Sequence, residues 1–365
     1  MFIRHMLRQK SAPRAQEPDT VAHLTALLNL ARQPSGPTRA RLLSDIADIF
    51  LARWPKLGPS ERALIGEILA RLAPSGEPIH RRALARRVAA LHEPPLVLAR
   101  LLAEDLPEIA EAILRKGPIL PDKDLVDIVG TRGRDHRLAI ASQRFLAAPV
   151  ALALVERGEE EVILRLLAND QAHIGPAAFA LLVESARENR ALRIPLLTRH
   201  DLPVGLMNRL FLVVGRAERK FIVAENAARL PAEAGGEDWR RQGTLEAKRR
   251  RLREARLVEI LRLGTRPELA RAMSGLAGIS LARAEEIVAD PSCEPMAIFA
   301  KACGIDRATF STFVLLSEPE GRRSLHETYD RLSLYEEVSE AIAERILDDW
   351  RDSPAAQDEG ARRSA

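Results

Sequence analysis

Apolar residues recur with helical spacing through the middle of the chain, and five prolines mark the same point of that pattern. The steps between them are 26, 28, 27 and 27 residues, for Pro95, Pro121, Pro149, Pro176 and Pro203. The fourth residue after each proline is apolar, and so is the seventh in all but one case, Glu156. Positions four and seven share one helical face. Proline suits the first turn of a helix, because that turn's N–H groups have no intrahelical partner. The pattern predicts that the same helix begins at each proline.

Second apolar segments lie between these helices: Ile109–Leu114, Leu138–Ile140, Val162–Leu167 and Leu192–Leu197. Each repeat is therefore predicted to hold two helices of about ten residues. A period of about 27 residues predicts an all-α fold, an α-solenoid of stacked helix pairs. The Leu-x-x-Leu-x-Leu signature of leucine-rich repeats is absent. A non-repetitive helical bundle with fortuitous prolines is the alternative.

One helix start carries an additional polar signal. Asp105 precedes Leu106-Pro107, and Glu108 follows three residues later. An acidic residue followed by a second acid at this distance is typical of a helix N-terminus with a side-chain cap. We therefore expect Asp105 to cap the helix that includes Ile109.

The chain outside the regular repeats is also predicted to be helical. Helices are expected at Val21–Ala31, Arg39–Arg53, from Pro59 toward Leu72, and Ile79–Leu91. The C-terminal part is expected to hold a basic helix at about Thr244–Leu263, a compact module at Pro267–Leu316 and one acidic amphipathic helix at Leu325–Asp352. The predicted organisation is a disordered tail (1–19), irregular capping helices (20–92), regular repeats (93–230), a linker (231–243), a basic helix with a hairpin module (244–316), and an acidic helix with its tail (317–365).

Three stretches of the sequence resemble a known bacterial family. They are Glu61–Leu69, the segment Leu101–Asp105 leading to Pro121–Leu125, and Leu166–Asp170. Together they resemble the bacterial domain-of-unknown-function family numbered 2336, which is similar to HEAT-type helical repeats. The resemblance covers most of residues 39–316 and implies a helical-repeat fold. It brings no established activity and no active-site residues.

Composition supports a large helical core and indicates the cellular compartment. Hydrophobic residues make up 46% of the chain and aromatic residues only 4%, as expected for closely packed Ala/Leu helices. The formal charge of +4 does not demand an anionic partner. Cys293 and Cys303 form no CxxC pair, so a reducing, cytoplasmic setting is expected. We identify no signal peptide and no apolar stretch long enough for a membrane span.

The sequence offers no catalytic constellation. The eight histidines are scattered and form no HxH or HExxH motif, and no phosphate-binding glycine loop or GxSxG elbow is present. Acidic pairs such as Asp122/Asp124 and Asp348/Asp349 are interpreted as helix caps and solvated faces, not as acid–base dyads. We therefore expect a protein that is not an enzyme and has no cofactor or metal.

A basic run follows the predicted repeats. Between residues 240 and 256 only Glu246 and Glu254 oppose eight basic residues: Arg240, Arg241, Lys248, Arg249, Arg250, Arg251, Arg253 and Arg256. The run could contact phosphates, dock on the acidic C-terminal helix, or form a solvated face. It lacks aromatic residues, which argues against stacking on single-stranded nucleic acid.

The segment 298–313 resembles a helix-turn-helix element. Ala300 would lie where the two helices cross, and Gly304 would adopt the left-handed turn. In that interpretation Arg307, Thr309 and Thr312 would face a DNA major groove. The alternative is a structural hairpin, which requires the same small residue and glycine.

These features lead to one expected function and one alternative. Stacked helix pairs present a long continuous surface, so the leading hypothesis is a scaffold or adaptor that binds another protein. The alternative is a nucleic-acid-binding protein that uses residues 240–256 and the hairpin at 298–313. The residues assigned to anion contact are Arg240, Arg241, Lys248, Arg249, Arg250, Arg251, Arg253, Arg307 and Thr309.

Overall fold

A computed structural model describes residues 43, 47–48, 51, 53–229, 256–260, 264–317 and 325–351 of the 365-residue chain. Within these ranges the regular elements are α- and 3-10 helices, joined by turns and one isolated β-bridge between Leu146 and Ala172. The predicted all-α class is confirmed. The chain divides into two compact units, Met1–Gly175 and Pro176–Ala365.

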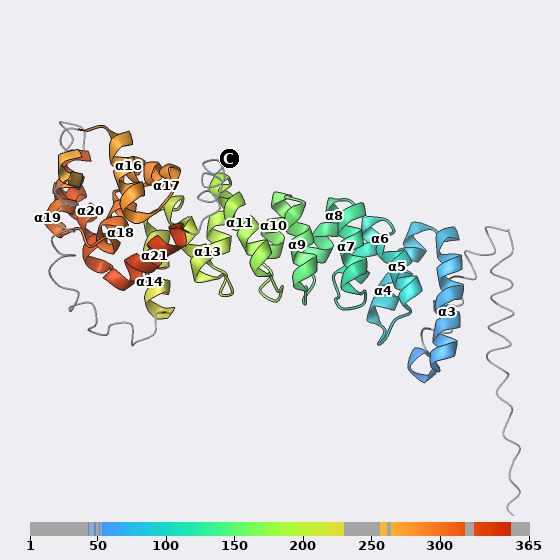
Figure 1. Ribbon diagram of the computed structural model, residues 1–365. Coiled ribbons are helices and arrows are strands. Elements are labelled where there is room, and N and C mark those ends of the chain that lie inside the picture. The colour runs from blue at the N-terminus through green and yellow to red at the C-terminus, as the bar shows by residue number, and fades with distance from the viewer. Residues whose placement is uncertain are drawn as a thin grey trace, which may run out of the picture. The chain divides into compact units, whose positions relative to one another are not determined.

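Successive helix pairs make up the first unit (Figure 1). The second helix of one pair contacts the second helix of the next, in the order α4, α6, α8 and α10. Among the first helices, α3 contacts α5 and α7 contacts α9. The bounds are α3 (Pro59–Leu72), α4 (Pro78–Ala90), α5 (Leu96–Ala103), α6 (Pro107–Leu114), α7 (Asp122–Thr131), α8 (Arg134–Ala141), α9 (Ala148–Glu156) and α10 (Glu160–Leu167), with 3-10 turns at Trp54–Lys56 and Ala73–Ser75.

The five regularly spaced prolines all lie at helix starts, as predicted. Three of them occupy the N-cap position: Pro95 of α5, Pro121 of α7 and Pro203 of α13 (Val204–Arg209). Pro149 is the second residue of α9, and Pro176 is the first residue of α11 (Pro176–Glu188). At all five positions the missing N–H removes no intrahelical hydrogen bond.

Both predicted positions are buried where proline is the N-cap, whereas only Val183 of the predicted positions is buried in α9 and α11. In α5 and α7 the fourth and seventh residues after proline are buried: Ala99, Leu102, Leu125 and Ile128. In α9 and α11 the predicted Ala153 and Ala180 are only half-buried. There proline lies inside the first turn, so the helix starts earlier and its buried face shifts by one or two residues.

Polar side chains at the ends of the second helices join neighbouring pairs. Lys116, just after the C-cap of α6, donates to the carbonyl oxygen of Ala89 near the end of α4. Asn169, in the same place after α10, donates from Nδ2 to the oxygens of Ala141 (3.0 Å) and Gln143 (2.7 Å). The last carbonyls of a helix lack intrahelical partners, so these bonds satisfy them from the adjacent repeat.

The predicted acidic cap of α6 is wrong. Leu106 is the N-cap residue and makes no side-chain cap hydrogen bond. The carboxylate of Asp105 instead accepts two hydrogen bonds from Arg81 in α4, in addition to one from the Leu106 N–H. Two charge-assisted hydrogen bonds from an arginine on a neighbouring helix stabilise the carboxylate more than a bond from a single backbone N–H does.

The second unit packs its helices around α18 (Figure 1). Seven of the nine residues of α18 are buried, and α17, α20 and α21 contact it. The bounds are α11 (Pro176–Glu188), α12 (Arg193–Leu197), α13 (Val204–Arg209), α14 (Arg216–Arg229), α16 (Arg266–Ala277), α17 (Leu281–Ala289), α18 (Glu294–Ala302), α19 (Arg307–Ser317), α20 (Leu325–Glu337) and α21 (Glu340–Arg351), with 3-10 turns at Arg190–Leu192 and Leu210–Leu212. None of the described helices combines the length and apolar character needed to cross a membrane.

The single acidic helix predicted for Leu325–Asp352 is wrong, because the chain breaks it into α20 and α21. Val338 at the break is buried, and the Ser339 hydroxyl oxygen accepts a bond of 3.3 Å from the Ile342 N–H. Serine favours the N-cap position over a helix interior. The break lets α20 pack on α18 and α19 while α21 packs on α13 and α18.

A buried ionic cluster ties α14 to the turn between α17 and α18. Arg219 donates from Nη2 to Asp290 Oδ2 (2.6 Å), from Nη1 to Glu294 Oε2 (3.0 Å) and from Nε to the Phe211 oxygen (2.8 Å). Burial raises the pKa of Asp290, but hydrogen bonds from Arg219 and Ser292 outweigh it and the net pKa is lowered. The charges of Arg219, Asp290 and Glu294 are therefore paired with one another within the second unit.

Candidate functional site: a groove across α6, α8 and α10

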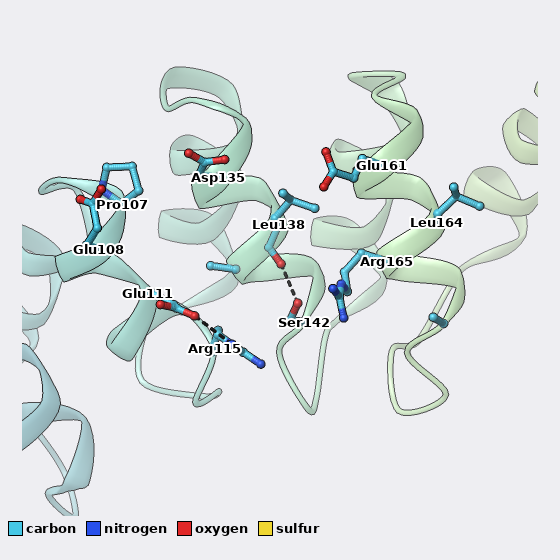
Figure 2. Close-up of a pocket in the computed structure, with 12 residues that line it drawn as sticks. Pro107, Glu108, Glu111, Arg115, Asp135, Leu138, Ser142, Glu161, Leu164 and Arg165 are labelled. Atoms are coloured by element: carbon cyan, nitrogen blue, oxygen red, sulfur yellow. Dashed lines mark hydrogen bonds and ion pairs between the residues drawn. The ribbon is translucent and has the colours of Figure 1, made fainter.

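The second helices of three successive pairs line a surface groove in the first unit (Figure 2). Its lining repeats from helix to helix. The second residue of each helix is acidic: Glu108 in α6, Asp135 in α8 and Glu161 in α10, at steps of 27 and 26 residues. An acidic residue in the first turn is stabilised by the helix dipole, so this row also helps to start each helix.

The centre of the groove is apolar over two of the three helices. The fifth residue of α8 is Leu138 and that of α10 is Leu164, and both are half-buried. In α6 the equivalent residue is Glu111, so the apolar strip ends there. Leu138 and Leu164 each leave part of their side chain available to a ligand.

Two arginines lie on the opposite side of the leucines from the acidic row. Arg165 is the sixth residue of α10 and Arg115 is the C-cap of α6. Figure 2 shows Asp135 and Glu161 on one side of Leu138 and Leu164, with Arg165 on the other side. The groove therefore has an acidic rim, an apolar floor and a basic rim.

Several of these charges are engaged by near neighbours. Glu111 Oε1 lies 2.8 Å from Arg115 Nη1, one turn along α6. Arg134 lies 3.2 Å from Glu161 and 3.9 Å from Asp135. Pairs of this kind on the surface stabilise little, about 0–1 kcal/mol, so a partner's charge can compete for either member.

The polar groups of the groove are suited to binding the side chains of a partner and not to catalysis or metal binding. The Ser142 hydroxyl donates to the Leu138 carbonyl oxygen (2.8 Å), so its proton is used within α8. No histidine or cysteine lines this groove. In the described part of the chain, no group of three or more His, Cys, Asp or Glu residues is arranged to hold a metal ion.

The family model for an uncharacterised protein conserved in bacteria (DUF2336) matches residues 109–348. The chain belongs to this family. The DUF2336 match begins in α6 and ends in α21, so it includes α8 and α10 and most of α6. No match to this chain was found among curated proteins or among solved structures.

The anion-contact residues predicted for this DUF2336 chain fall in two groups. Seven lie outside the described residues: Arg240, Arg241, Lys248, Arg249, Arg250, Arg251 and Arg253. Arg307 and Thr309 lie in α19 of the second unit. Arg307 Nη2 is 2.7 Å from Glu336 Oε1 of α20, and the Thr309 N–H donates to Asp306 Oδ1 (2.7 Å).

The tight turn predicted at Gly304 is confirmed. Gly304 has a φ of 64°, and the Ile305 N–H donates to the Ala300 oxygen (2.8 Å) across the turn. Tyr335 of α20 covers the hairpin: its hydroxyl donates to the Ile305 oxygen (2.7 Å), and its ring stacks on Phe310 with centroids 5.1 Å apart. DNA reading by α19 stays a prediction.

The groove was not identified from the sequence, although a signal for it was present. The prolines mark the first helix of each pair, whereas the groove is built by the second helices. In the sequence of the second helices, Glu108, Asp135 and Glu161 are in register, and so are Leu138 and Leu164.

Proposed function

We propose that this protein is a non-enzymatic scaffold or adaptor that binds another protein through the groove of its first unit. The observation that carries the proposal is the lining itself: charges of both signs on three equivalent helices flank half-buried leucines on two of them, α8 and α10. Apolar contact supplies affinity, and flanking charges supply orientation and specificity. We interpret the stacked pairs as an α-solenoid, an architecture that commonly presents such surfaces.

Charge argues for a protein partner at this groove. Its lining holds four acidic residues and two arginines. A nucleic acid presents a phosphate backbone, which four carboxylates would repel. The basic run at residues 240–256 supports nucleic-acid binding as the second candidate, at a separate place in the chain.

The test is capture from native lysate with and without nuclease, comparing two variants. Leu138→Glu with Leu164→Glu places charge in the apolar strip, whereas Val97→Glu alters an exposed residue of α5 (60% exposed) that does not line the groove. We expect a stoichiometric protein that survives nuclease, persists with Val97→Glu and is lost with the double variant, while circular dichroism shows all three proteins equally helical.

Two results would overturn the proposal. One is a captured protein that the double variant retains in full. The other is recovery of nucleic acid alone, abolished by changing Lys248 and Arg249–Arg251 to Glu, which would favour the second candidate.

A further inference from the structure

We infer that the groove of α6, α8 and α10 takes an amphipathic α-helix from its partner, with lysine or arginine along the edge that faces Glu108, Asp135 and Glu161. This inference rests on the proposed function and names the chemistry of the partner. It is carried by the spacing of the lining residues and by their charge.

Spacing favours a helix over an extended segment. Packed neighbouring helices lie about 8–10 Å apart, so Leu138 and Leu164, at the same position of α8 and α10, repeat at about that distance. A partner helix advances about 10.5 Å over seven residues and returns to nearly the same face. An extended strand places successive same-face side chains about 6.6 and about 13 Å apart, and neither distance matches the single helix spacing between Leu138 and Leu164.

Charge sets which edge of the partner faces which rim. The acidic row has the same helix-to-helix spacing as the leucines, so cationic residues at i, i+7 and i+14 would each meet one acid. The side chains of Asp135 and Glu161 are each 62% exposed, and their surface pairs with Arg134, at 3.9 and 3.2 Å, are weak enough for a partner's cation to compete. Arg115 and Arg165 on the other rim suit acidic residues on the opposite edge of the partner.

Glu111 determines which way the partner helix runs across α6, α8 and α10. It occupies in α6 the position that Leu138 and Leu164 occupy in α8 and α10. Two successive heptad positions of the partner should therefore be apolar, and the position that reaches α6 should be lysine or another polar residue. The reverse order would bury an apolar side chain against the Glu111–Arg115 ion pair.

The probe is a synthetic helical peptide with leucine at two heptad positions, lysine at the third, lysines along one edge and glutamates along the other. Two control peptides accompany it: one exchanges every lysine and glutamate, and one carries two interior prolines that prevent a helix. Fluorescence anisotropy with the full-length protein measures the affinities. We expect the first peptide to bind at least about tenfold more tightly than either control, and its affinity to fall as salt is raised.

Charge reversal in the protein sharpens the test. Glu108→Lys with Asp135→Lys and Glu161→Lys should invert the preference between the first peptide and its charge-exchanged control. The matched protein control is Asp122→Lys with Asp127→Lys and Glu156→Lys, which reverses three exposed acids on α7 and α9 outside the groove lining. This control should keep the original preference.

The outcomes separate this inference from the proposed function. Equal binding of the proline-containing peptide would overturn the helical partner, and an unchanged preference after groove charge reversal would overturn the cationic edge. In both cases a groove-dependent protein captured from lysate would leave the scaffold proposal standing. Both proposals would be overturned if no peptide bound and if the Leu138→Glu, Leu164→Glu protein still captured its partner from lysate in full.

Discussion

Arg81 and Asp105 form a two-pronged ion pair between consecutive second helices. Arg81 Nε lies 2.7 Å from Asp105 Oδ2, and Nη2 lies 2.9 Å from Oδ1. Both side chains are mostly buried, at 15% and 14% exposure. Arg81 also donates from Nη1 to the Gly76 oxygen (2.7 Å), so one guanidinium holds the loop before α4 and the start of α6 together.

The same contact recurs two helices further along. Arg137, the fourth residue of α8 as Arg81 is of α4, lies 2.7 Å from each carboxylate oxygen of Glu159, the N-cap of α10. Between α6 and α8 the fourth residue is Ala110, and His136 Nε2 lies 2.8 Å from the Asp105 backbone oxygen instead. The arginine contact thus alternates along the stack of second helices.

Asp105→Asn should destabilise the contact between α4 and α6. The change leaves the Arg81 charge mostly buried without its counter-charge, and we expect a loss of about 2 kcal/mol in local stability. Native-state hydrogen exchange of the amides of α4 and α6 measures it. Glu67→Gln, in the half-exposed Glu67–Arg71 pair, is the control and should cost under about 0.5 kcal/mol. Equal losses in the two variants would contradict the prediction.

The effect of Asp105→Asn should depend on pH. Burial raises the pKa of Asp105, but hydrogen bonds from Arg81 and the Leu106 N–H together with the Arg81 charge outweigh it, so the net pKa is lowered from 3.8. A carboxylate with a lowered pKa stabilises the fold above its unfolded pKa and loses that effect as pH falls through the folded value. The difference in urea midpoint between wild type and variant should be full at pH 6 and shrink below about pH 3.8. A difference that stays constant down to pH 3 would refute this account.

Trp350→Ala should detach α21 from its site in the second unit. Trp350 is 1% exposed, its Nε1 donates to the Asn208 oxygen (3.1 Å), and its ring lies 5.9 Å from that of Phe211. Removal of a buried tryptophan costs about 3–5 kcal/mol, which urea unfolding can measure. Asp348→Ala, at an exposed neighbour (63% exposed), should cost under about 0.5 kcal/mol. A cost below about 1 kcal/mol for Trp350→Ala would show that the helix is not held by this residue.

Arg307→Ala should leave any nucleic-acid binding unchanged. The carboxylate of Glu336 lies 2.7 Å from Arg307 and would repel a phosphate bound there, and Tyr335 covers the turn before α19. Electrophoretic mobility shifts with duplex DNA compare this variant with Lys248→Glu, which lies in the basic run. A loss of affinity on Arg307→Ala would favour α19 as a DNA reader.

Some of this fold could be predicted from local rules. Pro95, Pro121 and Pro203 mark helix starts because the conformation and missing N–H of proline act within one turn. The turn at Gly304 was predictable for a similar reason, since a left-handed residue favours glycine.

Other predictions failed because tertiary packing overrode the local sequence preference. Asp105 has the form of a helix cap, yet its carboxylate is held by Arg81, which is 24 positions away in the sequence and adjacent in space. The acidic C-terminal segment has helical periodicity throughout, yet it breaks near Ser339, where α20 packs on α19 and α21 on α13 while both contact α18.

The sequence by itself determined the all-α class and where most of the described helices begin, since proline placement and apolar spacing act over a few residues. Tertiary structure alone decided which carboxylates pair with arginine and which side chains share a surface. Glu108, Asp135 and Glu161 form one rim only because α6, α8 and α10 stack side by side. That stacking depends on contacts between residues some 26 positions apart, which local pattern does not specify.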